Sequence, residues 1–110
     1  MAGGRDIEIN KTIHERARLM ILTYLATREE APAPFNEIKS ALNMTGGNLS
    51  VQLRNLEEVG YVEITKAIEK RKTVTRVSLT PKGYEDLLSY LDNMEKLIKD
   101  VSGAMEERSE

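Results

Sequence analysis

The 110-residue chain has no cysteine and no tryptophan, and it contains a single histidine and a single phenylalanine. Without cysteine it can form neither disulfide bonds nor thiolate metal sites. No apolar run approaches the roughly 20 residues that a transmembrane helix needs, so we expect no membrane partner. The N-terminal residues lack the apolar segment of a secretory signal, which predicts a cytoplasmic protein. The lone His14 is not a metal site by itself, and we expect no metal and no cofactor.

The composition is that of one soluble globular domain, with 40% hydrophobic and 31% charged residues. Its net charge of −2 is unusual for a protein that binds nucleic acid, but the charges are unevenly distributed. Residues 44–82 contain seven lysines or arginines against four glutamates, a local charge of +3, and the remainder carries −5. The overall sign is therefore weak evidence against a nucleic-acid partner.

The first predicted helix follows a lead-in at residues 1–11. Thr12 and Glu15 have the spacing of a capping box, which indicates a helix start. Apolar residues at helical spacing then continue to about residue 27, so we expect a helix over residues 13–27.

A second and a third helix are predicted on either side of a short turn. Residues 31–34 read Ala-Pro-Ala-Pro, a stiff connector, and a short helix over residues 35–42 follows with Asn36 as its N-cap. Thr45 caps the third helix, which runs to about Val59. Its buried stripe is predicted to be Leu49, Leu53 and Leu56, and Gly60, which tolerates positive φ, ends it.

A hairpin and a long helix complete the predicted order. Residues 61–65 and 73–79 are β-branched, alternating runs, and residues 66–72 form a long charged loop between them. Thr80 and Pro81 have the pattern of a helix start, which predicts a last helix over residues 81–105.

The last helix carries an apolar seam at alternating spacings of three and four residues, typical of a helix–helix interface. The seam either closes over the domain's own core or pairs with a second copy. Because three heptads exceed what a small domain needs, we favour a homodimer. The predicted dimer interface consists of Ile13, Tyr84, Leu87, Leu91, Met94, Ile98, Val101 and Met105.

These elements predict a mostly α fold with a small β-hairpin (α+β), a winged helix-turn-helix with a long C-terminal dimerisation helix. The whole chain, residues 1–110, is one domain. Its core occupies residues 12–80, the hairpin or wing about 61–79, and the dimerisation helix 81–105.

A resemblance to a known family rests on three features of the sequence. They are Phe35, the segment Gly47-Asn48-Leu49-Ser50, and the segment Leu-Glu-Glu-Val-Gly-Tyr-Val at residues 56–62. Over residues 14–91 the chain resembles small winged-helix transcriptional regulators of bacteria and archaea, in the MarR-like and ArsR-like superfamily. Within that superfamily it is similar to the short "winged helix DNA-binding domain" family. The resemblance implies a homodimer that binds double-stranded DNA sequence-specifically and regulates transcription, with repression the expected mode. Gln52 stands where such proteins often have histidine, and without cysteine metal sensing has no support.

The residues predicted to contact DNA lie in the third helix and the wing. Glycines at a helix start let the backbone approach a phosphate, and amide side chains can read adenine in the major groove. Cations of the wing can follow phosphates or enter the minor groove. The alternative readings are a solvated polar face and lysines that blunt a sheet edge. The predicted contacts are Thr45, Gly46, Gly47, Asn48, Ser50, Gln52, Arg54, Lys66, Lys70, Arg71, Lys72 and Arg76.

No constellation of residues indicates an enzyme. Neighbouring carboxylates such as Glu57 and Glu58 point in different directions on a helix, and none lies beside a nucleophile. A homodimer is expected to place two recognition helices on half-sites about 10 bp apart. The alternative functions are a winged-helix protein-interaction module and a general DNA-binding chromatin protein. Whether a small effector exists remains open.

Overall fold

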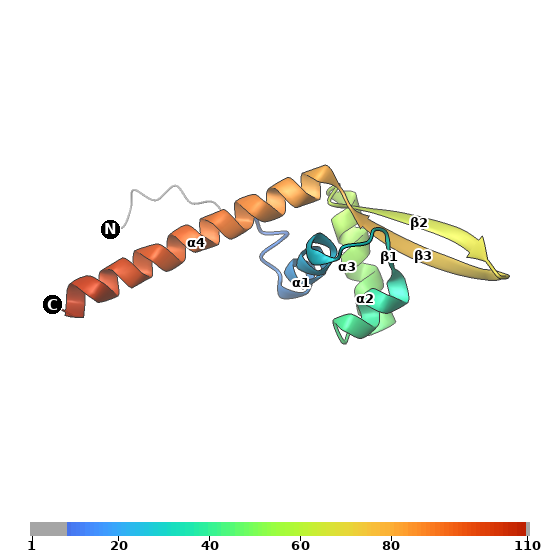
Figure 1. The fold of residues 1–110 in the computed structure, drawn as a ribbon, viewed down its shortest axis with the longest axis horizontal. Helices are drawn as coiled ribbons and strands as arrows, with labels where there is room; N and C mark the ends of the chain where they lie inside the picture. Colours follow the sequence, from blue (N-terminus) through green and yellow to red (C-terminus); the bar gives the residue numbers. More distant parts are fainter. Residues whose placement is uncertain (1–8, 110) are drawn as a thin grey trace.

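The computed structural model describes residues 9–109, so the part of the expected lead-in at residues 1–8 lies outside the described residues. Four helices and a three-stranded antiparallel sheet of order β1-β3-β2 make up this part of the chain (Figure 1). This architecture confirms the predicted winged helix-turn-helix. The elements are α1 (Arg16–Thr27), β1 (Ala33–Pro34), α2 (Phe35–Ala41), α3 (Gly46–Glu58), β2 (Val62–Glu69), β3 (Lys72–Leu79) and α4 (Pro81–Ser109).

The predicted start of α1 is wrong by three residues. Glu15 is the N-cap, and its carboxylate accepts a hydrogen bond from the Ala17 amide at 2.8 Å. The preceding residues form a separate turn, because the Asn10 side chain accepts from the Ile13 amide at 3.0 Å. Residues 11–14 therefore form a turn before the helix, and Thr12 is not at an N-cap position. Glu15 therefore begins the helix instead of closing a box.

The connector before α2 is a short edge strand, which the sequence did not predict. Ala33 and Pro34 of β1 pair with Val77 and Arg76 of β3. A proline is tolerated here because an edge strand needs hydrogen-bond donors on one side only. Pro34 also occupies the N-cap position of α2 without a side-chain cap, so the prediction of Asn36 as the cap is wrong.

Helix α3 forms as predicted. The hydroxyl of Thr45 accepts a hydrogen bond from the Asn48 amide at 3.1 Å, which satisfies one unpaired donor of the first turn. Leu49, Leu53 and Leu56 are buried. Gly60 has a φ of +83° and ends the helix, in the left-handed conformation that glycine adopts without a steric cost.

The wing differs from the predicted hairpin in the length of its strands. The β2–β3 ladder extends from Val62↔Leu79 to Glu69↔Lys72, so a two-residue turn replaces the predicted seven-residue loop. Both turn residues, Lys70 and Arg71, have positive φ values of 50° and 66°, as a type I′ hairpin turn requires. The half of the β2–β3 ribbon next to the turn has no buried residue on either face. Its sequence does not need to alternate between apolar and polar residues, so the pattern that predicts a strand is missing there.

The core lies between the helices and the base of the sheet. From α1 it receives Ile21 and Leu22, from α2 Ile38, from β3 Val77 and from α4 Leu87. Helix α4 packs on α1 only with its first turns and then continues away from the body, whereas the wing extends in the opposite direction (Figure 1). These two projections account for the elongated dimensions of 67 × 25 × 23 Å.

The junction of α3, β2 and α4 fixes where the long helix begins. The Thr80 hydroxyl donates to the Gly60 carbonyl at 2.6 Å and accepts from the Gly83 amide at 3.0 Å, so it caps α4 as predicted. The Lys82 ammonium donates to the Val59 carbonyl at 2.9 Å. A Cβ atom at Gly83 would lie 2.3 Å from the Tyr61 carbonyl oxygen. Glycine at this position therefore allows α4 to pack directly on the backbone of the wing.

Candidate nucleic-acid interface

The N-terminal turn of α3 is open to solvent. An added Cβ at Gly46 or Gly47 would meet nothing within 4 Å, so packing inside the chain does not require glycine at either position. Asn48 is exposed, and Thr45 is exposed although it caps the helix. Backbone amides at a helix N-terminus, together with the helix dipole, favour an anion. The glycines therefore leave the helix start accessible to a bulky phosphate.

The outer face of α3 has no acidic residue from Gly46 to Leu56. Ser50 and Arg54 are exposed on this face, as predicted for residues that meet DNA. Val51 is also exposed there, at 48% of its surface. Val51 was not among the predicted contacts, although a residue two positions after the buried Leu49 points away from the core on a helix.

Gln52 does not have the exposure expected of a base-reading residue. It is half-buried, its Oε1 atom is buried without a hydrogen-bond partner, and its Nε2 atom donates to Asn48 Oδ1 at 3.4 Å. Helical spacing places Gln52 beside the buried Leu49 and Leu56 rather than opposite them. In this conformation Gln52 cannot present both amide atoms to an adenine. The predicted bidentate contact would need a different side-chain rotamer.

A groove of about 680 Å³ separates α3 from the wing and brings cations from the two elements to one surface. Arg54 of α3 and Lys66 of β2 both line it, and Glu57 is the acidic residue among its walls. Ile64 lies on the same side of β2 as Lys66, since successive strand residues alternate between faces. The full lining is Phe35, Ser50, Leu53, Arg54, Glu57, Ile64, Lys66 and Thr75.

The wing divides the predicted cations between two faces and a tip. Arg76 pairs with Thr65 in the ladder and therefore lies on the face opposite to Lys66. There its guanidinium donates two hydrogen bonds to the Glu69 carboxylate, one of them 3.1 Å long. Those bonds lower the pKa of Glu69 and raise the pKa of Arg76. The charge of Arg76 is thus balanced by Glu69 rather than offered outward.

The tip of the wing presents the remaining cations. Lys70, Arg71 and Lys72 are all exposed, at the end of the ribbon that projects furthest from the body (Figure 1). Ile68 is 80% exposed beside them. Arg54 and Lys66 therefore share the groove, Lys70, Arg71 and Lys72 form an exposed group at the tip, and Arg76 belongs to neither set.

The predicted dimer residues separate into two groups. Ile13 and Leu87 belong to the core of the single chain and have no surface left for a partner, because α4 packs on α1 at its start. Met94 is half-buried against the same core. Tyr90, which was not among the predicted dimer residues, is buried too, and its hydroxyl lies 2.8 Å from His14 Nδ1. The exposed members are Tyr84, Leu91, Ile98, Val101 and Met105.

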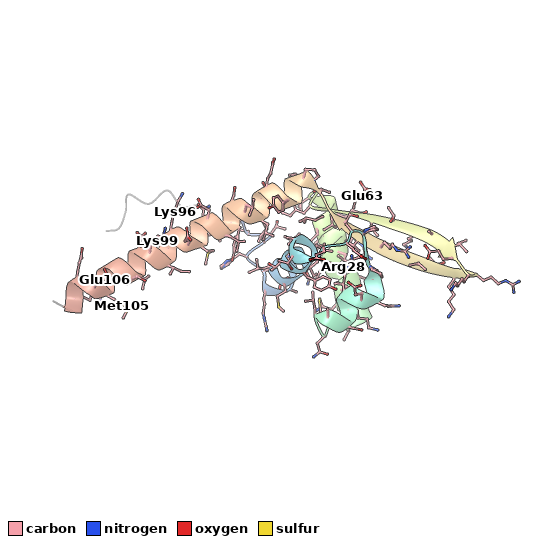
Figure 2. The ribbon with its side chains drawn as sticks, viewed as in Figure 1. Arg28, Glu63, Lys96, Lys99, Met105 and Glu106 are labelled. Carbon is pink, nitrogen blue, oxygen red and sulfur yellow. The ribbon has the colours of Figure 1, made fainter. Side chains whose placement is uncertain are left out.

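A cluster between α1 and α2 has a structural role. Arg28, at the end of α1 (Figure 2), donates to Glu37 of α2 with an Nη2–Oε1 distance of 2.9 Å. The Tyr24 hydroxyl donates to the same carboxylate. The hydrogen bonds from Arg28 and then from Tyr24 lower the pKa of Glu37. Within residues 9–109, no group of three metal-ligating side chains lies together, and no helix is long and apolar enough to cross a membrane.

Comparisons with known proteins agree with this geometry. Residues 17–98 match the family model described as "Winged helix DNA-binding domain". The chain is 34% identical over 91 residues to the uncharacterized protein MJ0432 of Methanocaldococcus jannaschii, covering 83% of this chain and 97% of that protein. It is also similar to the structure of a transcriptional regulator homologue from Pyrococcus horikoshii OT3. That comparison has a TM-score of 0.79 and 31% identity, and it covers 92% of this chain and 98% of the other.

A more distant similarity extends to a mutant of S. aureus MepR bound to an oligodeoxyribonucleotide. The TM-score is 0.63 at 22% identity, and the match covers 76% of this chain and 59% of that one. At this identity the likeness concerns the fold alone.

Proposed function

The chain belongs to the winged helix DNA-binding domain family, and on this premise we propose that it regulates transcription by binding double-stranded DNA sequence-specifically as a homodimer. Its expected mode is repression by occupying an operator, in the cytoplasm where a prokaryotic chromosome lies. We propose no catalytic step and no cofactor.

The observation that carries the proposal is that the outer face of α3 has no acidic residue between Gly46 and Leu56 and lies beside a cationic wing. A major groove of about 12 Å admits an α-helix, and its floor is read by side chains on the face that enters. Ser50 and Arg54 occupy that face in the free protein. Arg54 can donate two guanidinium hydrogen bonds to O6 and N7 of a guanine or bind a phosphate, and the open turn at Gly46 and Gly47 suits a second phosphate.

The wing supports the proposal through its charge and its reach. Lys66 extends the cationic surface of α3 along the groove, and the exposed tip at Lys70, Arg71 and Lys72 continues it away from the body. We propose that the tip follows the phosphates flanking the major groove, with Arg71 entering the adjacent minor groove. Arg76 contributes less to phosphate binding, because its guanidinium already donates to the Glu69 carboxylate.

The distal part of α4 supports the homodimer. Ile98 and Val101 are 63% and 61% exposed at a spacing of three residues, beyond the point where α4 leaves the core. Leu91 and Met94 continue the same stripe toward the body, and exposed apolar stripes of this kind mark interfaces between helices. Two-fold pairing through this stripe would present two copies of α3 to half-sites one helical turn apart.

The proposed function is tested by measuring duplex affinity as a function of salt. The duplex is obtained by in-vitro selection with the wild-type protein. Arg54→Ala is expected to weaken binding about tenfold, the lower part of the range for a base contact. Alanine at all three positions Lys70, Arg71 and Lys72 should reduce the slope of log affinity against log salt by roughly 2 to 3.

The matched control removes a cation far from the proposed interface. Lys96 lies on the distal half of α4 (Figure 2), where it pairs with Asp92 at 3.2 Å. Lys96→Ala should leave both affinity and salt slope unchanged. If neither the Arg54 nor the wing variant differs from this control, the proposed interface is wrong. If no duplex is bound at all, a protein partner replaces DNA as the explanation for the surface.

The homodimer is tested separately by light scattering after size exclusion. Ile98→Asp places a charge in the proposed helix–helix interface and should yield the mass of one chain. Lys99→Ala alters the neighbouring residue, which is paired with Glu95 at 3.5 Å, and should keep the mass of two chains. A wild-type protein with the mass of one chain at micromolar concentration would remove the dimer from the proposal.

A further inference from the structure

Val51 is an exposed valine on an otherwise polar helix face. It is 48% exposed, between Ser50 and the half-buried Gln52 in sequence, with Arg54 one turn further on. Valine is less favourable in a helix than alanine or the straight-chain residues, since its β-branch loses rotamer freedom. An exposed helical valine thus contributes little to helix stability, and its methyl groups contact no core.

The position of Val51 on α3 points directly away from the core. The buried residues Leu49, Leu53 and Leu56 define the inward direction, and Val51 lies two residues from Leu49, about 200° around the helix. Gly47 lies one turn before it on the same face and has open space around it. Gly47 therefore places no side chain between Val51 and an object that approaches this face from outside, and Asn48, the other neighbour on that turn, binds Gln52.

The residue expected to read bases from sequence, Gln52, is turned aside. Its Nε2 atom donates to Asn48 and its Oε1 atom is buried, which leaves the middle of the outer face to Val51 and Arg54. A guanidinium can pair with guanine or phosphate, but a valine offers only methyl groups. In the major groove of DNA the one apolar group that a base pair presents is the C5-methyl of thymine.

We propose that Val51 packs against the C5-methyl group of a thymine in the major groove and thereby selects that base in each half-site. The inference rests on the proposed binding of DNA through α3 and adds a specificity-determining contact to it. Arg54, one turn along the helix, contacts the neighbouring base pair or its phosphate. The operator should accordingly contain a thymine at a fixed distance from the position that Arg54 controls.

The test combines changes in the protein with removal of single methyl groups from the DNA. Each thymine of the in-vitro selected duplex is replaced in turn by uracil, which lacks only the C5-methyl group. Affinity is measured for wild-type protein, Val51→Ser and Val51→Thr. Burying one methyl group corresponds to roughly a fourfold change in affinity per half-site. Wild-type protein should bind about fourfold more weakly when one particular thymine of each half-site is replaced by uracil, and its affinity should not change at the other thymines.

Val51→Ser should bind the thymine and uracil duplexes equally at that position, because a hydroxymethyl group cannot cover the methyl. Val51→Thr keeps the shape and one methyl group, and it should retain part of the discrimination. Serine and valine have similar helix propensities, so the unfolding midpoint of Val51→Ser should equal that of wild type. This equality separates a lost contact from a damaged helix.

Three results overturn the inference. In the first, wild-type protein binds every uracil duplex as tightly as the parent duplex. In the second, Val51→Ser still distinguishes thymine from uracil as strongly as wild type does, which would attribute the effect to DNA shape. A selected half-site without thymine has the same consequence. Each of these leaves the proposed function intact. A wild-type protein that selects no sequence defeats the proposed function itself and the inference with it.

Discussion

Replacing Gly83 with alanine should destabilise the fold, although alanine is the better helix former. Gly83 is buried in the first turn of α4, where a Cβ would lie 2.3 Å from the Tyr61 carbonyl oxygen and 2.9 Å from Leu79 Cδ1. The first of these contacts is with backbone, which cannot rotate away. That carbonyl also accepts a hydrogen bond from the Thr80 amide at 3.0 Å, so moving it breaks the junction between wing and helix.

The expected magnitude follows from two opposing effects. Forcing an extra methyl group into a packed site costs about 1–3 kcal/mol. Replacing glycine by alanine inside a helix contributes up to about 1 kcal/mol in the other direction. We therefore expect Gly83→Ala to lower the free energy of unfolding by about 1–2 kcal/mol. For a domain of this size each kcal/mol also corresponds to a fall of roughly 4–8 °C in the midpoint of thermal unfolding.

The assay is urea unfolding followed by circular dichroism, with all variants at one protein concentration because dimerisation adds to apparent stability. Gly103→Ala is the matched control on the same helix. An added Cβ at Gly103 would meet nothing within 4 Å, so its stability should equal the wild type or exceed it by up to about 1 kcal/mol. If Gly83→Ala is as stable as Gly103→Ala, the close packing of α4 on the Tyr61 backbone is refuted.

Three further changes test the cluster of Arg28, Tyr24 and Glu37, the wing, and the start of α3. The folded-state pKa of Glu37 lies below its unfolded value because Arg28 donates to it, so its contribution to stability is present above the unfolded pKa and is lost as pH falls through the folded one. Glu37→Gln should therefore lower the urea midpoint at neutral pH, and a difference from wild type that does not shrink in acid would contradict this. Glu69→Gln should release Arg76 and steepen the salt slope of DNA binding by roughly 1, whereas an unchanged slope would keep Arg76 outside the interface. Gly47→Ala should leave the urea midpoint unchanged or raised, because the added Cβ meets nothing within the chain. It should weaken DNA binding about tenfold in an anisotropy titration, because the methyl group would obstruct the approach of a phosphate to the helix start, and unchanged binding would contradict that approach.

The helix-turn-helix could be predicted from sequence because its local signals agree with its packing. Thr45 caps α3, three leucines form its buried stripe, and Gly60 ends it in the left-handed conformation, as expected from residue chemistry alone. The start of α4 follows the same logic, since Thr80 caps it and Pro81 needs no amide donor.

The missed features depend on contacts that sequence patterns do not contain. The pairing of Ala33 with Val77 creates an edge strand of two residues, too short for any periodicity. The wing is longer than predicted because its outer part has no buried face to impose alternation. The turn at Lys70 and Arg71 adopts positive φ without the glycine or asparagine that usually signals it.

The candidate site was only partly accessible to the same reasoning. Exposure of Ser50 and Arg54 follows from helical spacing relative to the leucine stripe. Two other features depend on side-chain geometry, which residue spacing does not contain. Glu69 neutralises Arg76, and Gln52 turns toward Asn48. The exposure of Val51 follows from the same 100° rotation per residue, but a valine carries no hydrogen-bonding group that would mark it as a base contact.

If α3 and the wing together recognise a DNA sequence, two dissociation constants at physiological ionic strength should differ. One is measured for the in-vitro selected duplex and the other for a duplex of the same length and base composition with shuffled sequence. The selected duplex should bind at least about a thousandfold more tightly. Equal affinities would contradict this recognition and identify a protein that binds DNA without reading it.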